Sequence, residues 1–194
     1  EDHIQLDLSD PAATEAMIPE IRALLAPDGG MLHALVNNAA ISPKGEGGAR
    51  LGTLAMPVDG WQRVFQVNFF APILLARGLV EELARASGSV VNVTSIAGGR
   101  VHPFAGAAYS TSKAALASLT REMAADFAPR GVRVNAISPG EIDTSILSPG
   151  TDKIVQEQIP MRRLGRPEEV AQAIYFLCTE ASSYVNGAEI HING

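Results

Sequence analysis

Short apolar runs rich in β-branched residues alternate along this chain with longer stretches in which apolar residues recur at helical spacing. The short runs predict buried strands, and the longer stretches predict amphipathic helices. We expect strands at 3–8, 31–37, 88–95, 132–138 and 188–193. We expect helices at 11–25, 59–86 and 107–127, and a further helix that begins at 166. This alternation is typical of an α/β fold of the Rossmann type, a doubly wound parallel sheet with helices on both faces, here as a single domain over 1–194.

The composition narrows the classes of partner. The chain has 194 residues, 46% of them hydrophobic, and a formal net charge of -6. This acidic balance argues against nucleic-acid binding, which needs clustered Lys and Arg, and we interpret the basic cluster at 161–166 as a solvated loop. No apolar run is long enough to cross a membrane. The single cysteine, Cys178, lies in an apolar run; it excludes a disulfide within the chain and favours a reducing, cytoplasmic location.

A tyrosine and a lysine stand four residues apart in the stretch AAYSTSKAAL, as Tyr109 and Lys113. Residues at this spacing share one face of a helix, so the ammonium can lie near the phenol and lower its pKa, which is about 10 when unperturbed. A tyrosine tuned in this way can pass a proton at neutral pH. Chance pairing is the alternative, but the small neighbours would also let a ligand or another backbone approach the helix.

Polar residues end several of the expected strands, at the edge of the sheet where ligands of open α/β folds bind. Ser95 ends one strand and could donate a hydrogen bond to a substrate oxygen, or it could merely cap the turn. Asn37 ends another strand, and Pro139 with Gly140 ends a third. Asn68 is polar within an apolar part of an expected helix, where a satisfied core amide is the alternative.

Taken in order, these residues resemble the short-chain dehydrogenase/reductase family in its classical form, including its 3-oxoacyl-[acyl-carrier-protein] reductases. The stretch NNAA is similar to the family's N-N-A-G turn, and VRVNAISPG, GRPEEVAQAIYFL and SSYVNGAEIHING follow its later landmarks. Asn68, Ser95, Tyr109 and Lys113 fall on the four catalytic positions. One departure is a longer spacing between serine and tyrosine, which keeps Thr94 open as an alternative to Ser95.

The resemblance implies an oxidoreductase that interconverts a ketone and a secondary alcohol with NAD or NADP. Tyr109 would be the acid/base, Lys113 would lower its pKa and hold the nicotinamide ribose, Ser95 would polarise the substrate oxygen, and Asn68 would position a water. The residues expected to contact the cofactor are Asp7, Leu8, Asn37, Ala39, Tyr109, Lys113, Pro139, Gly140, Ile142 and Thr144. The four histidines are scattered and there is one cysteine, so no metal site is expected.

The Gly-rich turn that opens such a fold does not precede the strand expected at 3–8, so we expect the natural protein to carry roughly 50 to 60 further N-terminal residues. The loops at 41–57, 99–106 and 141–163 are expected to select the substrate. Within them we interpret His102 and Glu141 as loop surface rather than substrate ligands.

Apolar surface on the helices at 59–86 and 107–127 indicates a homodimer or homotetramer. Two other functions remain open. One is a non-catalytic dinucleotide-binding protein, and the other is a sugar-nucleotide epimerase or dehydratase.

Overall fold

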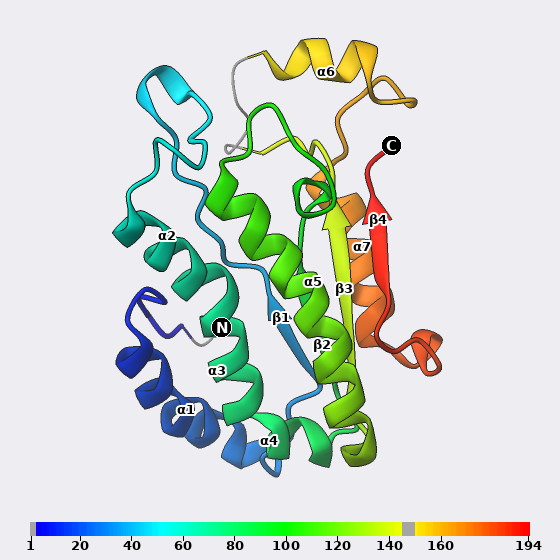
Figure 1. Cartoon of the computed structure of the whole chain (residues 1–194). Helices are drawn as coiled ribbons and strands as arrows, with labels where there is room; N and C mark the ends of the chain where they lie inside the picture. The colour runs from blue at the N-terminus through cyan, green and yellow to red at the C-terminus, as the bar shows by residue number, and fades with distance from the viewer. Residues whose placement is uncertain (1–2, 145–149) are drawn as a thin grey trace.

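The structure, a computed structural model, describes residues 3–144 and 150–194. Within these residues a parallel sheet has the strand order β1-β2-β3-β4 (Figure 1). The strands are β1 (Ala34–Asn37), β2 (Ser89–Val93), β3 (Arg133–Pro139) and β4 (Glu189–Ile192). All of them point the same way, so their carboxyl ends meet at one edge of the sheet.

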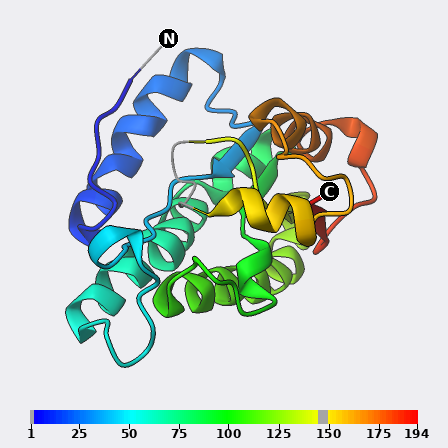
Figure 2. The ribbon, with the colours of Figure 1, turned by 90° about the horizontal axis from the view of Figure 1, so that it is seen from above.

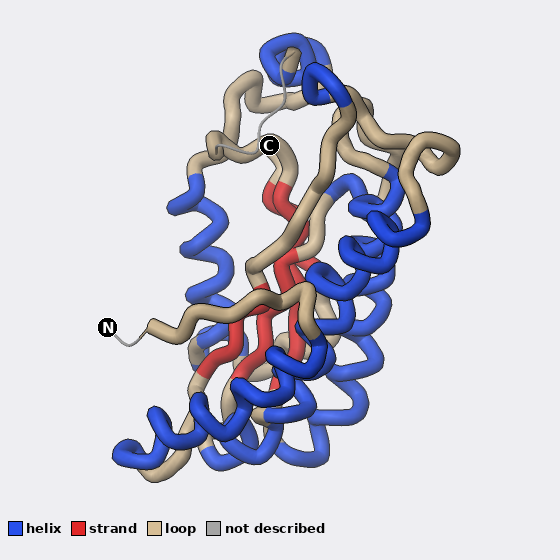
Figure 3. Tube along the Cα trace, turned by 90° about the vertical axis from the view of Figure 1, so that its left-hand side faces the viewer, coloured by secondary structure: helices blue, strands red, loops and turns tan. Residues whose placement is uncertain are grey.

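Helices cover both faces of this sheet, as the sequence predicts (Figures 1 and 3). On one face lie α5 (Ala107–Phe127) and α3 (Ala71–Gly78), and on the other lies α7 (Pro167–Cys178). Alternate strand residues point to opposite faces. Val90 and Val134 therefore join the core under α5, while Val91 and Ile137 pack against α7.

The remaining helices flank this arrangement. They are α1 (Pro11–Leu25), α2 (Val58–Phe65), α4 (Val80–Arg85) and α6 (Thr151–Glu157). Helix α1 packs against α3 and begins as its sequence indicates, because the Asp10 carboxylate accepts hydrogen bonds from the backbone N–H groups of Ala12 and Ala13. Figure 2 shows α6 above the carboxyl ends of the strands.

The strand expected at 3–8 is wrong, because these residues form no ladder (Figure 3). A strand needs a neighbour to take its backbone N–H and C=O groups, and among the described residues no strand lies beside this segment. Its backbone instead turns towards α1 through a bond from Asp10 N–H to the Asp7 carbonyl.

Two further expectations need correction. The single helix expected at 59–86 is divided into α2, a π-helical turn at Gln66–Phe70, α3 and α4. The segment 141–163, expected to be a loop, contains α6. Ile154 and Val155 give that helix an apolar side that packs against Phe104.

Candidate active site

Tyr109 and Lys113 lie in the first two turns of α5, which begins and ends at the residues that the sequence predicts. The Lys113 ammonium nitrogen lies 5.8 Å from the centre of the Tyr109 ring. A neighbouring backbone approaches the same helix at Gly98. A Cβ atom there would lie 2.9 Å from Ala114 N and 3.1 Å from Lys113 C. The small residues of this stretch therefore let the turn after β2 pack directly on α5.

Lys113 is almost fully buried, with 2% of its surface exposed. Its Nζ donates a hydrogen bond of 2.6 Å to the Val93 carbonyl at the end of β2. Burial lowers the pKa of Lys113 from 10.5 to about 8. The ammonium is thus still mostly protonated at neutral pH, and one of its three N–H groups is committed to the sheet.

The pKa of Tyr109 moves in the opposite direction from the one expected. Burial raises it, a hydrogen bond with Ser95 acts against that rise, and the Glu141 carboxylate adds to it. The expectation that Lys113 dominates was wrong because the phenol lies in an interior that disfavours its anion. In this state Tyr109 is protonated at neutral pH and can donate a proton.

Ser95 caps the turn after β2, which is one of the two interpretations that the sequence leaves open; its hydrogen bond to a substrate oxygen stays a prediction. Its Oγ accepts a bond of 3.2 Å from Ala97 N–H, and its hydroxyl is near enough to Tyr109 to act against the rise in the tyrosine pKa. The Thr94 hydroxyl bonds with the Ile137 carbonyl at 2.9 Å and with Glu189 Oε1 at 2.7 Å. Thr94 is therefore committed to the strands β3 and β4, and Ser95 is the hydroxyl that faces the tyrosine.

Asn68 lies in the π-helical turn and is fully buried. Its Oδ1 accepts from Ile41 N–H at 2.8 Å, and its Nδ2 donates to the Ile41 carbonyl at 3.0 Å and to Ser112 Oγ at 3.1 Å. Both N–H groups of the amide are used, so the side chain clamps the loop after β1 to α5. Widened turns of this kind are frequent at functional sites.

A cavity of about 660 Å³ opens at the carboxyl edge of the sheet. Ser95, Tyr109 and Lys113 line it, whereas Asn68 lies outside its lining. The nicotinamide-side residues of the predicted set also line it, namely Pro139, Gly140, Ile142 and Thr144. A Cβ atom on Gly140 would lie 2.9 Å from Asn193 Cβ, so only glycine lets this wall approach the end of β4 so closely.

The residues predicted for the adenine side are not part of this lining. Asp7 is exposed and accepts bonds from the N–H and hydroxyl of Ser9, and the Leu8 carbonyl lies 3.5 Å from Gln66 Nε2. Ala39 is exposed at the end of β1. Asn37 is buried and donates to Asn92 Oδ1 at 2.8 Å, which braces β1 against β2.

Three residues that the sequence did not single out as ligands also line the cavity, namely Lys44, His102 and Glu141. His102 Nε2 lies 2.6 Å from Glu141 Oε1, and each side chain is only 11% exposed. The interpretation of His102 and Glu141 as loop surface is therefore wrong. Two loops distant in sequence fold over each other here, and local spacing does not reveal such a contact.

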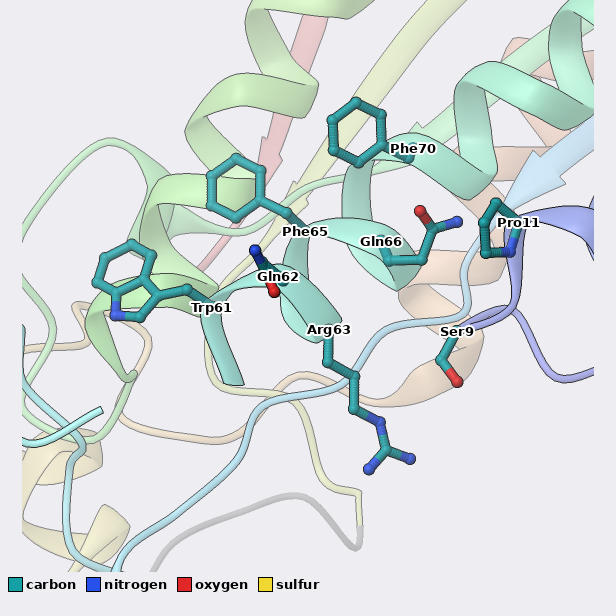
Figure 4. Close-up of a pocket in the computed structure, with 8 residues that line it drawn as sticks. All are labelled: Ser9, Pro11, Trp61, Gln62, Arg63, Phe65, Gln66 and Phe70. Atoms are coloured by element: carbon teal, nitrogen blue, oxygen red, sulfur yellow. The ribbon is translucent and has the colours of Figure 1, made fainter. Parts of the chain in front are cut away.

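A second cavity, of about 610 Å³, lies between the start of α1 and α2 (Figure 4). Trp61, Phe65 and Phe70 line it from α2 and the π-helical turn, and Ser9 and Pro11 line it from the side of α1. None of the four predicted catalytic residues belongs to its lining. Ser95, Tyr109 and Lys113, three of the four residues predicted to be catalytic, line the other cavity instead.

Two kinds of feature are absent from residues 3–144 and 150–194. No helix there is both long enough and apolar enough to span a membrane. No group of three or more His, Cys, Asp or Glu side chains in the same residues is arranged to hold a metal ion.

The fold and the cavity define a class, a Rossmann-type oxidoreductase with a serine, a tyrosine and a lysine at the carboxyl edge of its sheet. A family model described as enoyl-(acyl carrier protein) reductase matches residues 1–194. The chain belongs to the short-chain dehydrogenase/reductase family, whose members are oxidoreductases that use NAD or NADP and act on CH–OH groups.

Several known proteins are similar over most of this chain. Protein FixR of Bradyrhizobium diazoefficiens is 60% identical over 194 residues, which are all of this chain and 69% of FixR. The 3-oxoacyl-[acyl-carrier-protein] reductase FabG of Aquifex aeolicus is 37% identical over 172 residues, 84% of this chain and 64% of FabG. The chain thus spans about two thirds of the length of these two relatives.

Among solved structures, a Brucella ovis short-chain dehydrogenase/reductase in complex with a partially ordered NAD superposes with a TM-score of 0.86. It is 62% identical, and the match covers 99% of this chain and 78% of that one. A 3-oxoacyl-[acyl-carrier protein] reductase with bound NAD from Brucella melitensis superposes with a TM-score of 0.85 at 33% identity, covering 98% of this chain and 69% of that one.

Proposed function

We propose that this protein interconverts a small ketone and a secondary alcohol with NAD or NADP, and that Tyr109 is its proton donor and acceptor. The observation that carries the proposal is the convergence of Ser95, Tyr109 and Lys113 on one cavity at the carboxyl edge of the sheet. In the direction of reduction, the protonated Tyr109 gives its proton to the carbonyl oxygen. In the direction of oxidation, the phenolate takes the proton of the alcohol.

Ser95 holds the substrate oxygen in place. Its hydroxyl lies beside the Tyr109 phenol, so an oxygen that binds between them receives hydrogen bonds from both. Asn68 is a positioning residue, because its amide ties the loop after β1 to the helix that carries the tyrosine. That Asn68 also orders a water next to Lys113 stays a prediction.

The described residues fit a nicotinamide cofactor. Lys113 has N–H groups beyond the one that bonds Val93, and Pro139 and Gly140 form a wall of the same cavity, where glycine lets that wall pack closely on Asn193. When bound, the nicotinamide supplies or accepts the hydride at the carbonyl carbon. Lys113 and Thr144 would hold its ribose and carboxamide side, with Asp7, Leu8, Asn37 and Ala39 towards the adenine.

We also propose a cytoplasmic homodimer or homotetramer of single-domain protomers. In support, Phe70, which lines the second cavity (Figure 4), is 48% exposed, and Val58 at the start of α2 is 71% exposed. Light scattering on the wild type and on Phe70→Glu tests the assembly. Equal masses for the two would argue against an interface at this face.

The enzymatic proposal is tested by NAD(P)H oxidation with a panel of ketones and 3-oxoacyl thioesters. Tyr109→Phe should lower kcat by about 100-fold or more, as the loss of a general acid does. Tyr175→Phe is the matched control, because Tyr175 is 73% exposed on α7 and is not among the residues that line the cavity. Wild-type turnover by Tyr109→Phe would refute the role of Tyr109.

A further inference from the structure

Three charged or ionisable side chains line the cavity at the carboxyl edge of the sheet, which Ser95, Tyr109 and Lys113 also line. Lys44 comes from the loop after β1, His102 from the loop before α5, and Glu141 from the loop after β3. These loops meet around Phe104. Lys44 Nζ donates to the Phe104 carbonyl, and Phe104 N–H lies 3.3 Å from His102 Nδ1.

Glu141 is already occupied by His102. Because His102 Nδ1 accepts from Phe104 N–H, the proton of the neutral ring is assigned to Nε2, which donates to Glu141 Oε1 at 2.6 Å. The two side chains thus form a fixed hydrogen-bonded pair. The carboxylate keeps its charge in this pair: burial lowers the pKa of Lys44, and the Glu141 charge acts against that lowering without contacting the ammonium.

Lys44 is the cation in this wall whose hydrogen-bond donors are only partly used. Its Nζ has three donors, and the structure shows a backbone carbonyl as the acceptor of one of them. Among the described residues no carboxylate oxygen lies within 4.0 Å of Lys44 Nζ. The side chain is half-buried, and burial of an ammonium is unfavourable unless an anion or several hydrogen bonds compensate it.

The charged residues that line the cavity have a positive sum, although the chain as a whole has a negative net charge. The formal net charge is -6, yet two of the chain's three lysines, Lys44 and Lys113, line the cavity. Glu141 is the single Asp or Glu among the described lining residues. An anionic substrate is therefore attracted to this cavity from an otherwise acidic surface.

Building on the proposed function, we propose that the substrate is a small oxo or hydroxy carboxylic acid whose carboxylate binds Lys44. Its reacting carbon then lies towards Ser95 and Tyr109 in the same cavity. The substrate carboxylate supplies the anion in direct contact that Lys44 lacks among the described residues, and the His102–Glu141 pair lines the same cavity. Lys44 is a specificity-determining residue in this arrangement and takes no part in proton transfer.

The test compares two nearly isosteric substrates, 3-oxobutanoate and its neutral amide 3-oxobutanamide. Loss of a charge-assisted hydrogen bond predicts that Lys44→Met lowers kcat/KM for the carboxylate by about 30-fold, mainly through KM. For the amide, kcat/KM should change by less than about 3-fold, the ordinary scatter of a cavity-lining substitution. Lys44→Arg keeps the charge and should restore much of the activity with the carboxylate.

Two further arms make the result decisive. Lys153→Met removes the remaining lysine, which is exposed on α6, and should leave both substrates unaffected. Without any turnover, butanoate should bind wild type more tightly than butanamide in isothermal titration calorimetry, and Lys44→Met should abolish that difference. Equal binding of the two probes to wild type, or equal losses on both substrates in Lys44→Met, would overturn the proposal. Turnover of other ketones that depends on Tyr109 would then leave the proposed function standing.

Discussion

Lys113→Met should abolish turnover while leaving the folded chain at least as stable as wild type at neutral pH. A pKa of about 8 in place of 10.5 corresponds to about 3 kcal/mol against the charged form in the folded state. The bond from Nζ to the Val93 carbonyl offsets about 1.5–3 kcal/mol of this. Because methionine fills a similar volume, the variant should be more stable than wild type by about 0–2 kcal/mol at pH 7.

The pH dependence of this difference follows from the lowered pKa. Between pH 8 and 10.5 the folded wild type has lost the Lys113 proton, whereas the unfolded chain still holds it. The stability that this group contributes to wild type therefore rises with pH across that window, by up to about 3 kcal/mol. Lys113→Met lacks the group, so its advantage over wild type should shrink or reverse from pH 7 to pH 10.

Urea unfolding followed by the fluorescence of Trp61, the single tryptophan, measures both effects. Lys153→Met is the matched control, because this exposed lysine should give no pH-dependent difference from wild type. A stability difference for Lys113→Met that stays constant from pH 7 to pH 10 would refute the argument from burial. So would a loss of more than about 2 kcal/mol at pH 7, which would mean that the hydrogen bond outweighs desolvation.

Three further substitutions test the geometry of the site. Gly98→Ala places a Cβ 2.9 Å from the backbone of α5, so it should lower stability by about 1–3 kcal/mol and reduce kcat. In Gly99→Ala the nearest atom to the new Cβ is the Ile96 carbonyl oxygen at 3.8 Å, so this control should change neither quantity. Thermal unfolding and turnover assays measure both effects. Glu141→Gln removes a carboxylate that raises the pKa of the tyrosine, so the pH profile of alcohol oxidation should move to lower pH; an unmoved profile would contradict that coupling. Ser95→Ala should lower kcat/KM by about 10-fold or more, while Thr94→Val should mainly lower the melting temperature, and the reverse pattern would reassign the hydroxyl.

The regular elements that carry the chemistry could be predicted because local patterns define them. Helix α5 has its predicted bounds, and the strands β2 and β3 lie within one residue or two of theirs. Buried parallel strands are continuous apolar runs, and this pattern needs no knowledge of the neighbours. The segment 3–8 has a strand's pattern too, but a strand forms only beside a partner, and its own residues do not supply one.

The same distinction applies to the residues predicted to be catalytic. The i, i+4 spacing of Tyr109 and Lys113 and the strand-end position of Ser95 are local features, and the structure brings all three to one cavity. The direction of the tyrosine pKa is a property of its surroundings, and burial reverses the effect that a neighbouring ammonium alone would have. A buried phenol that keeps its proton at neutral pH is in the form that can donate to a carbonyl oxygen.

The wall formed by Lys44, His102 and Glu141 shows why substrate choice is harder to predict than chemistry. Each residue lies on a different loop, and no repeat or spacing links them. They meet because Phe104 offers its carbonyl to Lys44 and its N–H to His102, so the backbone at one residue organises both. Loop residues whose side chains bond to the backbone of one loop residue can be substituted without disturbing the strands and the helix below them. Substrate specificity can therefore change in this fold while the proposed proton-transfer groups at the end of β2 and on α5 stay as they are.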